Sequence, residues 1–416
     1  MKNLQLQHQA LFILCTGYFQ PYLDTLFLPI IIGIDKSIVK FSVLQFCPAD
    51  IPAYAVNTAA KFSVPLYTET YHNKPALIGT FWDVVRGTIV IRSLVRRGEV
   101  TVLHPRSYIP GAMAMLVKML EPQVQIVFDS DGLMPDERVE FGSWSLNSPI
   151  YKLFRFIEKK LMEQSDVVLT RTEQAKKILL ERNKSSINPE KFLVIPNGKD
   201  TSVFTSIAQN ERQEVRQRYG VGENTPLIVY VGSMATQYMP ESMFLFFSYL
   251  LKLEQKAHFL LLTSGNKENL LALAQQHNIA PESFTIDYVV PDAVPTILAS
   301  ADVGLALRMP SLSQRAVSPI KVCEYLLCGT PVIANFGVGD LDNLFNHHPE
   351  IGCLLPDTSN ASLETATKWV VDEVMPKREA LTQKCRSVGV EYFSLDTVSS
   401  KYTEVYRSLK LVSFSQ

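Results

Sequence analysis

The stretch SPIKVCEYLLCGTPVIA, residues 318–334, joins charged side chains to an apolar helix pattern. Pro319 suits the first turn of a helix, whose free N–H groups and positive dipole attract phosphate. Lys321 adds a point charge there, and Glu324, one turn later, is placed to accept two hydrogen bonds from a ribose diol. The alternative is an exposed Lys–Glu pair on a core helix, which contributes little. The residue types therefore indicate a nucleotide site.

A second set of candidate ligand contacts occurs in LHPRSYIPGAMAML, residues 103–116. Arg106 and Ser107 lie between an expected strand and an expected helix, and ligands of doubly wound sheets bind at the carboxyl ends of strands. The alternative is that Ser107 caps the helix beside a solvent-facing Arg106. We expect these two residues to line a ligand cleft.

The next expected strand ends in an acidic loop, VFDSDGLMPDERVE, residues 127–140. Asp129 and Asp131 are expected to border the cleft and to meet sugar hydroxyls. A calcium site is a rival interpretation, but the spacing does not match the twelve-residue calcium loop. The DSD triplet also imitates the Asp-x-Asp pair that holds a divalent ion in transferases of another, single-domain architecture. We expect no metal here.

The first loop, CTGYFQPYLD, spans residues 15–24. It follows an expected strand, and its Gly17 would let a ligand approach the backbone closely. The aromatic residues of this loop could stack on a sugar or lipid, although core packing is the commoner fate of such residues. Gly17 is therefore a candidate cleft residue.

Short apolar runs alternate with helical patterns along most of the chain, and several runs are apolar throughout, which is typical of parallel strands covered on both faces. The expected strands are 10–17, 40–47, 100–105, 125–130, 166–172 and 192–198, then 226–233, 258–265, 284–290, 302–308 and 331–335. Two such sets predict an α/β protein with two Rossmann-like, doubly wound domains facing across a cleft.

With 416 residues, the chain is long enough for two domains. A polar, charged stretch at 205–226 separates the two sets of strands. We expect an N-terminal domain over 1–205 and a C-terminal domain over 206–390. Residues 391–416 read as a helix that packs back toward the N-terminal domain.

The composition limits which binding partners and which cellular compartment are expected. Forty basic and forty-one acidic residues give a net charge of −1, so a broad nucleic-acid surface is not expected. The six cysteines form no CxxC pair and indicate a reducing compartment. The start of the chain lacks a signal-peptide pattern, and Gly17, Pro21, Asp24 and Pro29 interrupt the apolar run at 10–34. We expect a cytoplasmic protein, with peripheral contact at the inner membrane face left open.

Several short motifs in order resemble those of the family 4 retaining glycosyltransferases. The pattern Pro-x-Lys-x-x-Glu-Tyr-x-x-x-Gly-x-Pro-Val-Ile-Ala resembles the family signature, VIPNGKDTSVF at 194–204 its interdomain motif, YVGS at 230–233 the first turn of its C-terminal domain, and ILASADVGLAL at 297–307 a later helix-strand unit. The resemblance covers roughly residues 95–345. It implies the GT-B arrangement, with residues 1–205 as the acceptor-side domain and residues 206–390 as the nucleotide-sugar-binding domain. It also implies a nucleoside-diphosphate sugar as donor substrate, with no further cofactor.

The resemblance also implies roles for the candidate residues. Glu324 would hold the ribose, while Lys321 and Arg308 would neutralise the diphosphate as catalytic cations. The nucleobase of the donor would lie near Val290. Gly232 and Ser233 would let the backbone approach the donor closely. The remaining expected donor contacts are Arg315, Ser318, Pro319 and Ile320. The acceptor would be a carbohydrate or a lipid-linked or protein-linked group, in polysaccharide or glycolipid biosynthesis.

Three positions depart from the family pattern. Ala316 stands where the family usually has a first Glu, Ser233 where it has an Arg, and Tyr238 where it has a Lys. Either the cations Arg308, Arg315 and Lys321 compensate, or turnover is lost. We favour compensation, because a leaving diphosphate needs cations. The alternatives are a catalytically inactive partner or sugar-binding subunit, and an epimerase, for which no acid–base set is readable.

Overall fold

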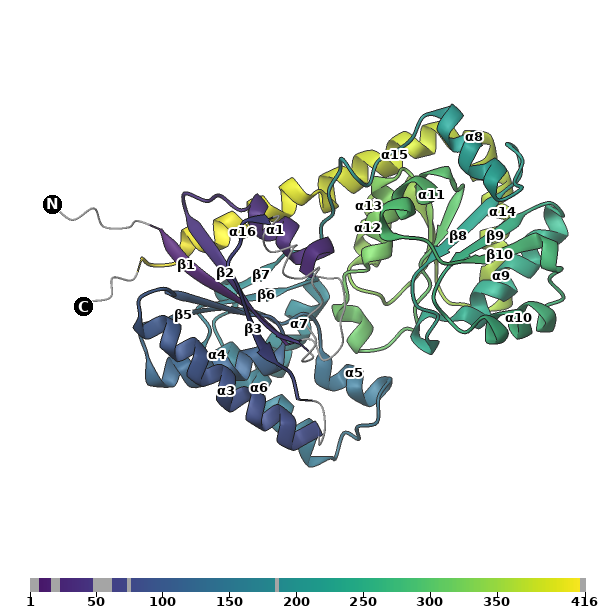
Figure 1. Cartoon of the computed structure of the whole chain (residues 1–416). Helices are drawn as coiled ribbons and strands as arrows, with labels where there is room; N and C mark the ends of the chain where they lie inside the picture. The colour runs from purple at the N-terminus through teal and green to yellow at the C-terminus, as the bar shows by residue number, and fades with distance from the viewer. Residues whose placement is uncertain (1–6, 16–22, 48–61, 73–75, 184–186, 412–416) are drawn as a thin grey trace. The chain divides into compact units, whose positions relative to one another are not determined.

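The structure is a computed structural model that describes residues 7–15, 23–47, 62–72, 76–183 and 187–411. Gly17 therefore lies outside the described residues. The chain divides into two compact units, drawn in Figure 1. Unit 1 comprises Met1–Pro196 with Val398–Gln416, and unit 2 comprises Asn197–Thr397.

The first division falls after Pro196, whereas the sequence analysis places it after residue 205. Residues 197–205 group with unit 2 because their polar atoms bond there. Asn197 bonds to Ser318, and Arg386 donates to the carbonyls of Thr201 and Phe204. The segment just before the polar stretch of 205–226 is therefore fixed to unit 2.

Unit 1 is built on a seven-stranded parallel sheet in the order β3-β2-β1-β4-β5-β6-β7. Its strands are β1 (His8–Cys15), β2 (Val39–Cys47), β3 (Leu66–Thr70), β4 (Val102–Pro105), β5 (Gln125–Asp129), β6 (Val167–Thr170) and β7 (Phe192–Val194). The central strands β4, β5 and β6 are buried at every position, as covered parallel strands must be. The strand order reverses between β1 and β4, which is the point where such folds bind ligands.

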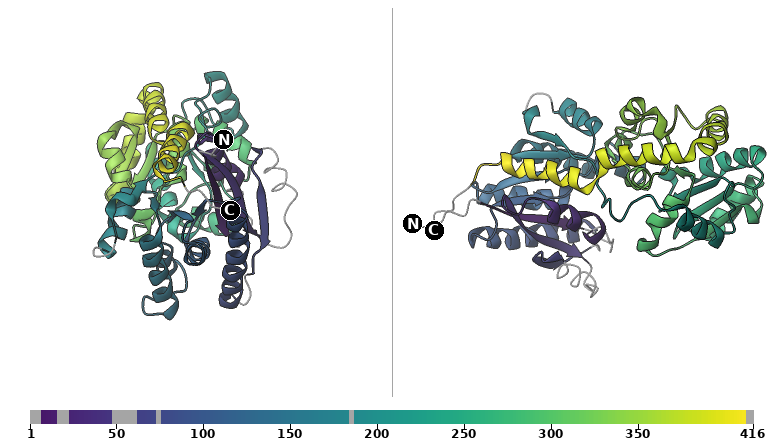
Figure 2. Two further views of the ribbon diagram at one scale, coloured as in Figure 1. Left: turned by 90° about the vertical axis from the view of Figure 1, so that its left-hand side faces the viewer. Right: turned by 90° about the horizontal axis from the view of Figure 1, so that it is seen from above.

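Helices cover both faces of this sheet. The connections β3 to β4, β4 to β5, β5 to β6 and β6 to β7 all run in one direction, so right-handed crossovers put their helices on one face. Those helices are α3 (Ala76–Arg96), α4 (Tyr108–Leu120), α5 (Met134–Glu140), α6 (Pro149–Gln164) and α7 (Glu173–Arg182). The opposite face carries α1 (Leu28–Gly33) and α16 (Leu395–Ser408), which contact each other where Ser399 donates to the Ile30 carbonyl (Figures 1 and 2).

Unit 2 repeats the plan with six parallel strands in the order β10-β9-β8-β11-β12-β13. They are β8 (Leu227–Val231), β9 (His258–Leu262), β10 (Phe284–Asp287), β11 (Val303–Leu305), β12 (Val332–Asn335) and β13 (Gly352–Leu355). The helices are α8 (Gln209–Arg218), α9 (Pro240–Leu253), α10 (Lys267–Gln276), α11 (Val294–Ser300), α12 (Ile320–Leu327), α13 (Leu341–His347), α14 (Asn360–Trp369) and α15 (Met375–Phe393). Here the order reverses between β8 and β11.

The prediction of two parallel-sheet α/β domains is confirmed, and each expected strand falls on an observed one. Two observed strands, β3 (LYTET) and β13 (GCLL), were not expected. Both lie at a sheet edge, where one neighbour is missing and polar or short sequences are tolerated. They therefore lack the continuous apolar run that marks the central strands.

Candidate active site

The turn after β8 brings the backbone of Gly232 against the side chain of Lys321. Gly232 has φ of +118°, a conformation that side chains rarely adopt. A Cβ atom added there would lie 3.0 Å from Lys321 Cε and 3.2 Å from Nζ. The glycine thus provides both the turn and the space for the lysine. The predicted close approach of this backbone to a donor stays a prediction.

The Lys321 ammonium lies between tyrosine rings. Its Nζ is 4.0 Å from the ring centroid of Tyr238 and 5.2 Å from that of Tyr230, within cation–π range. Within the described ranges, no acceptor lies within hydrogen-bond distance of this Nζ. Its pKa is lowered to about 7, first by burial and then by the Arg308 charge, against the opposing effect of Glu324. The group is a cation without an anionic contact.

Arg308 follows β11, on the other side of the strand reversal. The Asn335 side chain fixes its backbone, accepting from the Arg308 N–H and donating to its carbonyl, both at 2.9 Å. The guanidinium carbon lies 4.9 Å from the Tyr238 ring centroid, so one ring serves both cations. The Arg308 Nε is buried without a hydrogen-bond partner in the structure. The structure therefore brings together Gly232, Lys321 and Arg308.

Helix α12 begins beside these cations with no side-chain cap. Pro319 is the residue before the first helical turn, one position earlier than predicted, and the helix starts at Ile320. The N–H groups of Val322 and Cys323 donate to the Pro319 carbonyl. The N–H groups of Ile320 and Lys321 thus lie in the first turn, at the positive end of the helix dipole. This arrangement favours the binding of an anion.

Burial of Tyr325 fixes the direction of α12. Its hydroxyl donates to the Leu305 carbonyl and accepts from the Val231 N–H, each at 3.3 Å, so the helix is tied to β11 and β8. A Cβ on Gly304 would come within 2.6 Å of the Tyr325 ring, so β11 needs a glycine there. The site residues are therefore held by the central strands of unit 2.

Glu324 forms an ion pair that the sequence analysis missed. Its Oε1 lies 2.9 Å from Lys199 Nζ, and both side chains are mostly buried. Lys199 also sits 5.1 Å from the Phe204 ring centroid, and its backbone bonds to Phe393 and Leu395. Lys199 could have been singled out, because it lies within the VIPNGKDTSVF motif. The spacing of residues alone does not show which carboxylate it pairs with.

Ser318 is buried and already has a protein partner. Its Oγ accepts from the Asn197 N–H at 3.3 Å, and its carbonyl accepts from the Asn197 side chain at 2.8 Å. Ser318 therefore anchors the segment before α12 to residue 197. The predicted direct donor contact stays a prediction.

The other predicted donor contacts are separate surface positions. Ser233 is exposed, and its Oγ accepts from the Ala235 N–H at 3.3 Å. Val290 is exposed at the start of a short turn, Pro291–Ala293. Arg315 is exposed in the turn Ser313–Ala316, while Ala316 itself is fully buried. A ligand contact at these positions remains a prediction.

In unit 1, a buried carboxylate joins the ends of three strands. Asp129 accepts from Arg106 Nη1 at 2.7 Å and from Arg171 Nη2. Burial alone would raise the pKa of Asp129, but Arg171 and Arg106 outweigh it and lower the pKa. Asp129 is fully buried, and both arginines already engage it. The predicted contact with sugar hydroxyls stays a prediction.

Asp131 and Ser107 have unusual backbones at these strand ends. Asp131 (φ +53°) and Ser107 (φ +71°) adopt the left-handed region. Asp131 is partly exposed and accepts from Arg106 Nη2. Ser107 precedes α4 without a side-chain cap bond, and its N–H donates to the Asp129 carbonyl at 2.8 Å. Arg106, Ser107 and Asp131 are thus brought together.

His104 lies within β4, and its partner comes from the far end of the chain. Its Nδ1 lies 2.6 Å from the Tyr406 hydroxyl, and its Nε2 is buried without a partner. The pKa of His104 is lowered to about 3, chiefly by burial. Arg171 Nη1 bonds to the Tyr402 hydroxyl at 3.1 Å. This cluster completes unit 1 and was not predictable from spacing.

Metal ligands do not gather in the part of the chain that the structure describes: no group of three His, Cys, Asp or Glu side chains is placed to hold an ion. The DSD triplet fails for a local reason, because two arginines engage Asp129 and one of them also engages Asp131. The residues present do not fit a metal at DSD.

Two family models match consecutive parts of the chain. "Glycosyltransferase Family 4" matches residues 43–203, and "Glycosyl transferases group 1" matches residues 211–388. The chain belongs to the family 4, group 1 glycosyltransferases. Both matches meet near the boundary between the structural units.

Among curated proteins, α-maltose-1-phosphate synthase of Mycolicibacterium smegmatis is 24% identical over 139 residues, or 33% of this chain. The match spans about a third of that relative's length (34%). HepE from Anabaena, solved in complex with UDP and glucose, has a TM-score of 0.71 at 14% identity, covering 97% of this chain and 100% of HepE. Sucrose-phosphate synthase from Thermosynechococcus elongatus has a TM-score of 0.71 at 15% identity, covering 96% and 98% of the two chains. These likenesses confirm the Rossmann-like fold.

The structure explains how this family member departs from the usual pattern. Tyr238 stands where the resemblance to the family predicts a Lys, and its ring contacts two cations. Ala316, at the position of the usual first Glu, is packed in the core. A carboxylate is therefore absent from that position.

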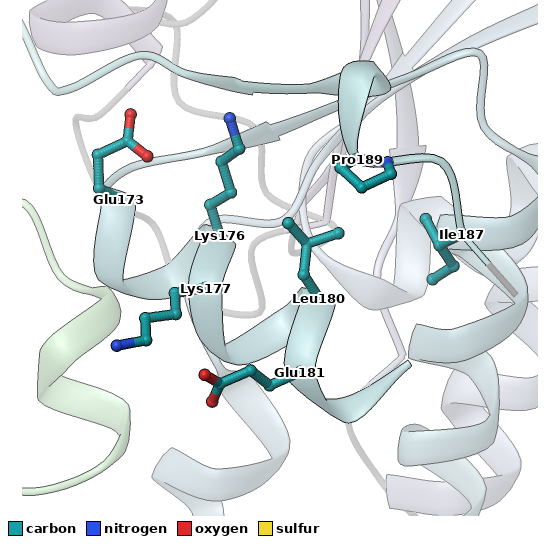
Figure 3. Close-up of a pocket in the computed structure, with 7 residues that line it drawn as sticks. All are labelled: Glu173, Lys176, Lys177, Leu180, Glu181, Ile187 and Pro189. Carbon is teal, nitrogen blue, oxygen red and sulfur yellow. The ribbon is translucent and has the colours of Figure 1, made fainter. Parts of the chain in front are cut away.

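A pocket of about 380 Å³ lies elsewhere, on α7 of unit 1 (Figure 3). Its lining consists of Glu173, Lys176, Lys177, Leu180, Glu181, Ile187 and Pro189. The charged part of the lining consists of two glutamates and two lysines, and none of the candidate site residues contributes to the pocket. The pocket gives no chemical reason to be the active site.

Proposed function

We propose that this chain transfers a sugar from a nucleoside diphosphate to an acceptor hydroxyl, with retention of anomeric configuration and without a metal ion. One observation carries the proposal. Lys321 and Arg308 meet beside the open start of α12, at the strand reversal of unit 2, and Gly232 leaves room for close approach. A diphosphate is the anion that suits two cations and a helix start.

In this mechanism the acceptor oxygen attacks the anomeric carbon from the face that the diphosphate leaves. The bond from the anomeric carbon to the diphosphate oxygen breaks, and the departing diphosphate takes the hydroxyl proton. Lys321 and Arg308 stabilise the charge that develops on it, while Glu324 orients the ribose. No protein nucleophile is required.

The acceptor is proposed only as a class: a carbohydrate or a lipid-linked or protein-linked hydroxyl, in polysaccharide or glycolipid biosynthesis. UDP is the first nucleotide to try, because HepE was solved with UDP and glucose. Candidate acceptor contacts are Arg106, Ser107 and Asp131, which lie together at strand ends in unit 1.

The test offers UDP, GDP and ADP sugars to the pure protein together with simple sugars as acceptors, and it measures nucleotide release in excess EDTA. We expect turnover with at least one donor, unchanged by EDTA, and an α-linked product from an α-linked donor by NMR. Loss of activity in EDTA that magnesium or manganese restores would refute the metal-free mechanism. Tight nucleotide binding without turnover would instead support the inactive sugar-binding alternative.

A further inference from the structure

A buried carboxylate on α3 of unit 1 forms no ion pair with a Lys or Arg among the described residues. Asp83 is fully buried. Its Oδ2 accepts from the His72 N–H at 2.8 Å, and its Oδ1 lies 2.6 Å from His72 Nδ1. Burying a carboxylate is costly unless hydrogen bonds or a cation compensate. Both compensating contacts come from one residue, so Asp83 and His72 act as a unit.

The carboxylate determines which ring nitrogen of His72 carries the hydrogen. An ionised carboxylate accepts hydrogen bonds and donates none, so Nδ1 is the donor. In the neutral ring, Nε2 then holds a free lone pair, and no residue in the described ranges bonds to it. The His72 side chain is 41% exposed, whereas that of Asp83 is not exposed at all. A buried group therefore fixes the ring, and its outer nitrogen is left for a ligand.

Helix α3 holds the segment that follows β3 (Figure 1). It is the longest described helix of unit 1, and no helix of the described ranges is long and apolar enough to cross a membrane. A Cβ atom on Gly79 would lie 2.3 Å from the His72 carbonyl oxygen, so the helix reaches His72 only through a glycine. Asp83 follows one turn later on the same side of the helix. Arg86 then pairs with Glu69 of β3, which fixes the strand end along α3.

His72 lies at the edge of the sheet where ligands of this fold bind. The Tyr71 N–H donates to the carbonyl of Cys47, the last residue of β2, at 2.7 Å. Burial and then the charge of Asp83 raise the pKa of the thiol of Cys15, the last residue of β1, so Asp83 lies near that strand end. The candidate acceptor contacts follow β4, the next strand in the sheet, at the same edge.

We propose that His72 is an acceptor-binding residue, whose Nε2 accepts a hydrogen bond from a hydroxyl group of the acceptor while Asp83 positions the ring. The inference rests on the proposed transfer to a hydroxyl group. The bound hydroxyl is a neighbour of the attacking one, because the departing diphosphate takes the proton of the attacking group. The acceptor is therefore a carbohydrate, which carries several hydroxyl groups, rather than a molecule with a single one.

One substitution separates this role from a structural one. A structural pair needs the contact between Nδ1 and Asp83 but makes no use of Nε2. Asparagine can direct an amide N–H to the carboxylate, as Nδ1 does, and has no atom at the position of Nε2. His72→Asn should therefore keep the fold, which circular dichroism checks, and lose the contact with the acceptor.

The first test measures transfer to simple sugars, with donor and acceptor varied separately. His72→Asn should raise the acceptor KM about threefold to tenfold, the usual effect of one hydrogen bond, and leave kcat and the donor KM unchanged. The matched control is His277→Asn in unit 2, where His277 Nε2 lies 3.0 Å from Glu241 Oε1. An acceptor KM that stays the same in His72→Asn, or rises equally in both variants, would overturn the proposal.

A second test does not depend on turnover, so it decides the role of His72 even if no donor supports transfer and the proposed function fails. Two-bond ¹H–¹⁵N spectra of the labelled full chain show which ring nitrogen is protonated, and His72→Asn identifies the His72 signals. In mildly alkaline buffer we expect the Nδ1–H form in the wild type and a mixture in Asp83→Asn. Sugars of the assay should shift the Nε2 resonance. An Nε2–H form in the wild type, or no shift with any of these sugars, would refute the assignment.

Discussion

Lys199 Nζ lies 2.9 Å from Glu324 Oε1, across 125 residues of sequence. The pair ties the segment that enters unit 2 to the helix that heads the candidate donor site. Because the contact engages one carboxylate oxygen, Glu324 keeps a second oxygen for a ligand. Lys199 thus orients the residue assigned to the ribose.

This pair gives the first prediction. Glu324→Gln should weaken UDP binding about tenfold or more, because a charge-assisted hydrogen bond is worth about 1.5–3 kcal/mol. Lys199→Met should lower the free energy of unfolding by about 1–3 kcal/mol, since it leaves a mostly buried carboxylate unpaired. Calorimetry and urea denaturation measure the two effects. Equal UDP affinity in Glu324→Gln would remove Glu324 from the donor site.

Gly232→Ala should abolish the close approach of Lys321. The new Cβ would meet Lys321 Cε and Nζ at 3.0 and 3.2 Å, so the ammonium must move. Gly220→Ala is the matched control, because Gly220 also has positive φ (+69°) but open space around it. Both variants should lose similar stability, while only Gly232→Ala should weaken UDP binding. A similar UDP affinity in the two variants would contradict the assignment.

The lowered pKa of Lys321, about 7, predicts proton uptake on donor binding. At pH 8 much of the free protein holds a neutral amine, whereas a bound diphosphate favours the ammonium. Calorimetry in buffers of different ionisation enthalpy should therefore show protons taken up, and affinity should fall as pH rises through 7. Lys321→Arg, which stays charged, should show no uptake from this position. Uptake that persists in Lys321→Arg would assign it to another group.

The lowered pKa of Lys321 also makes the stability of the fold depend on pH. Between about 7 and 10.5 the unfolded state binds more protons than the folded one, so the Lys321 contribution to stability rises with pH across that window. Below pH 7 the full penalty of burying the ammonium applies. Lys321→Met should therefore raise the melting temperature more at pH 6 than at pH 9. The reverse order would show that the amine is already well solvated.

Tyr238 should act through its ring. Tyr238→Phe keeps the face that Lys321 and Arg308 contact and should bind UDP like the wild type, whereas Tyr238→Leu should weaken binding about threefold to tenfold, for the loss of about 0.5–1.5 kcal/mol. The leucine variant should also move the pH midpoint of binding downward, because the ammonium loses a stabilising contact. If Phe and Leu behave alike, Tyr238 does not position the cations.

Tyr406→Phe tests how much the contact between α16 and β4 stabilises unit 1. It removes the hydroxyl that lies 2.6 Å from His104 Nδ1 and leaves a buried nitrogen unpaired, at a cost of about 1–3 kcal/mol. Tyr392→Phe, at a partly exposed hydroxyl in unit 2, is the control and should cost less. Urea denaturation measures both. An equal cost for the two would mean that His104 finds another partner.

Central strands were predictable because their apolar runs reflect burial on both faces, as in LIVYV of β8. Two of the four edge strands, β3 and β13, were not predicted, because their short sequences LYTET and GCLL lack a continuous apolar run and resemble loops. The head of α12 was also predictable, because Pro, Lys and Glu at fixed spacing follow from local helix geometry.

Side-chain contacts between residues far apart in the chain could not be predicted from the sequence alone. The acidic loop seemed exposed because it is polar, yet Asp129 is buried where Arg106 and Arg171 neutralise it. Nothing in the local sequence shows that two arginines from other strands converge on that carboxylate. The Lys199–Glu324 and His104–Tyr406 contacts were missed for the same reason.

The return of the chain to unit 1 at Val398 has a consequence for synthesis. Tyr406 contacts His104 of β4, and Tyr402 contacts Arg171. Unit 1 therefore contains both the first residues to be synthesised and the last. A ribosome must finish nearly the whole chain before unit 1 can bury its core, whereas unit 2 is contiguous and can fold earlier. During that interval the nascent sheet of unit 1 lacks the contacts that Tyr402 and Tyr406 make with Arg171 and His104.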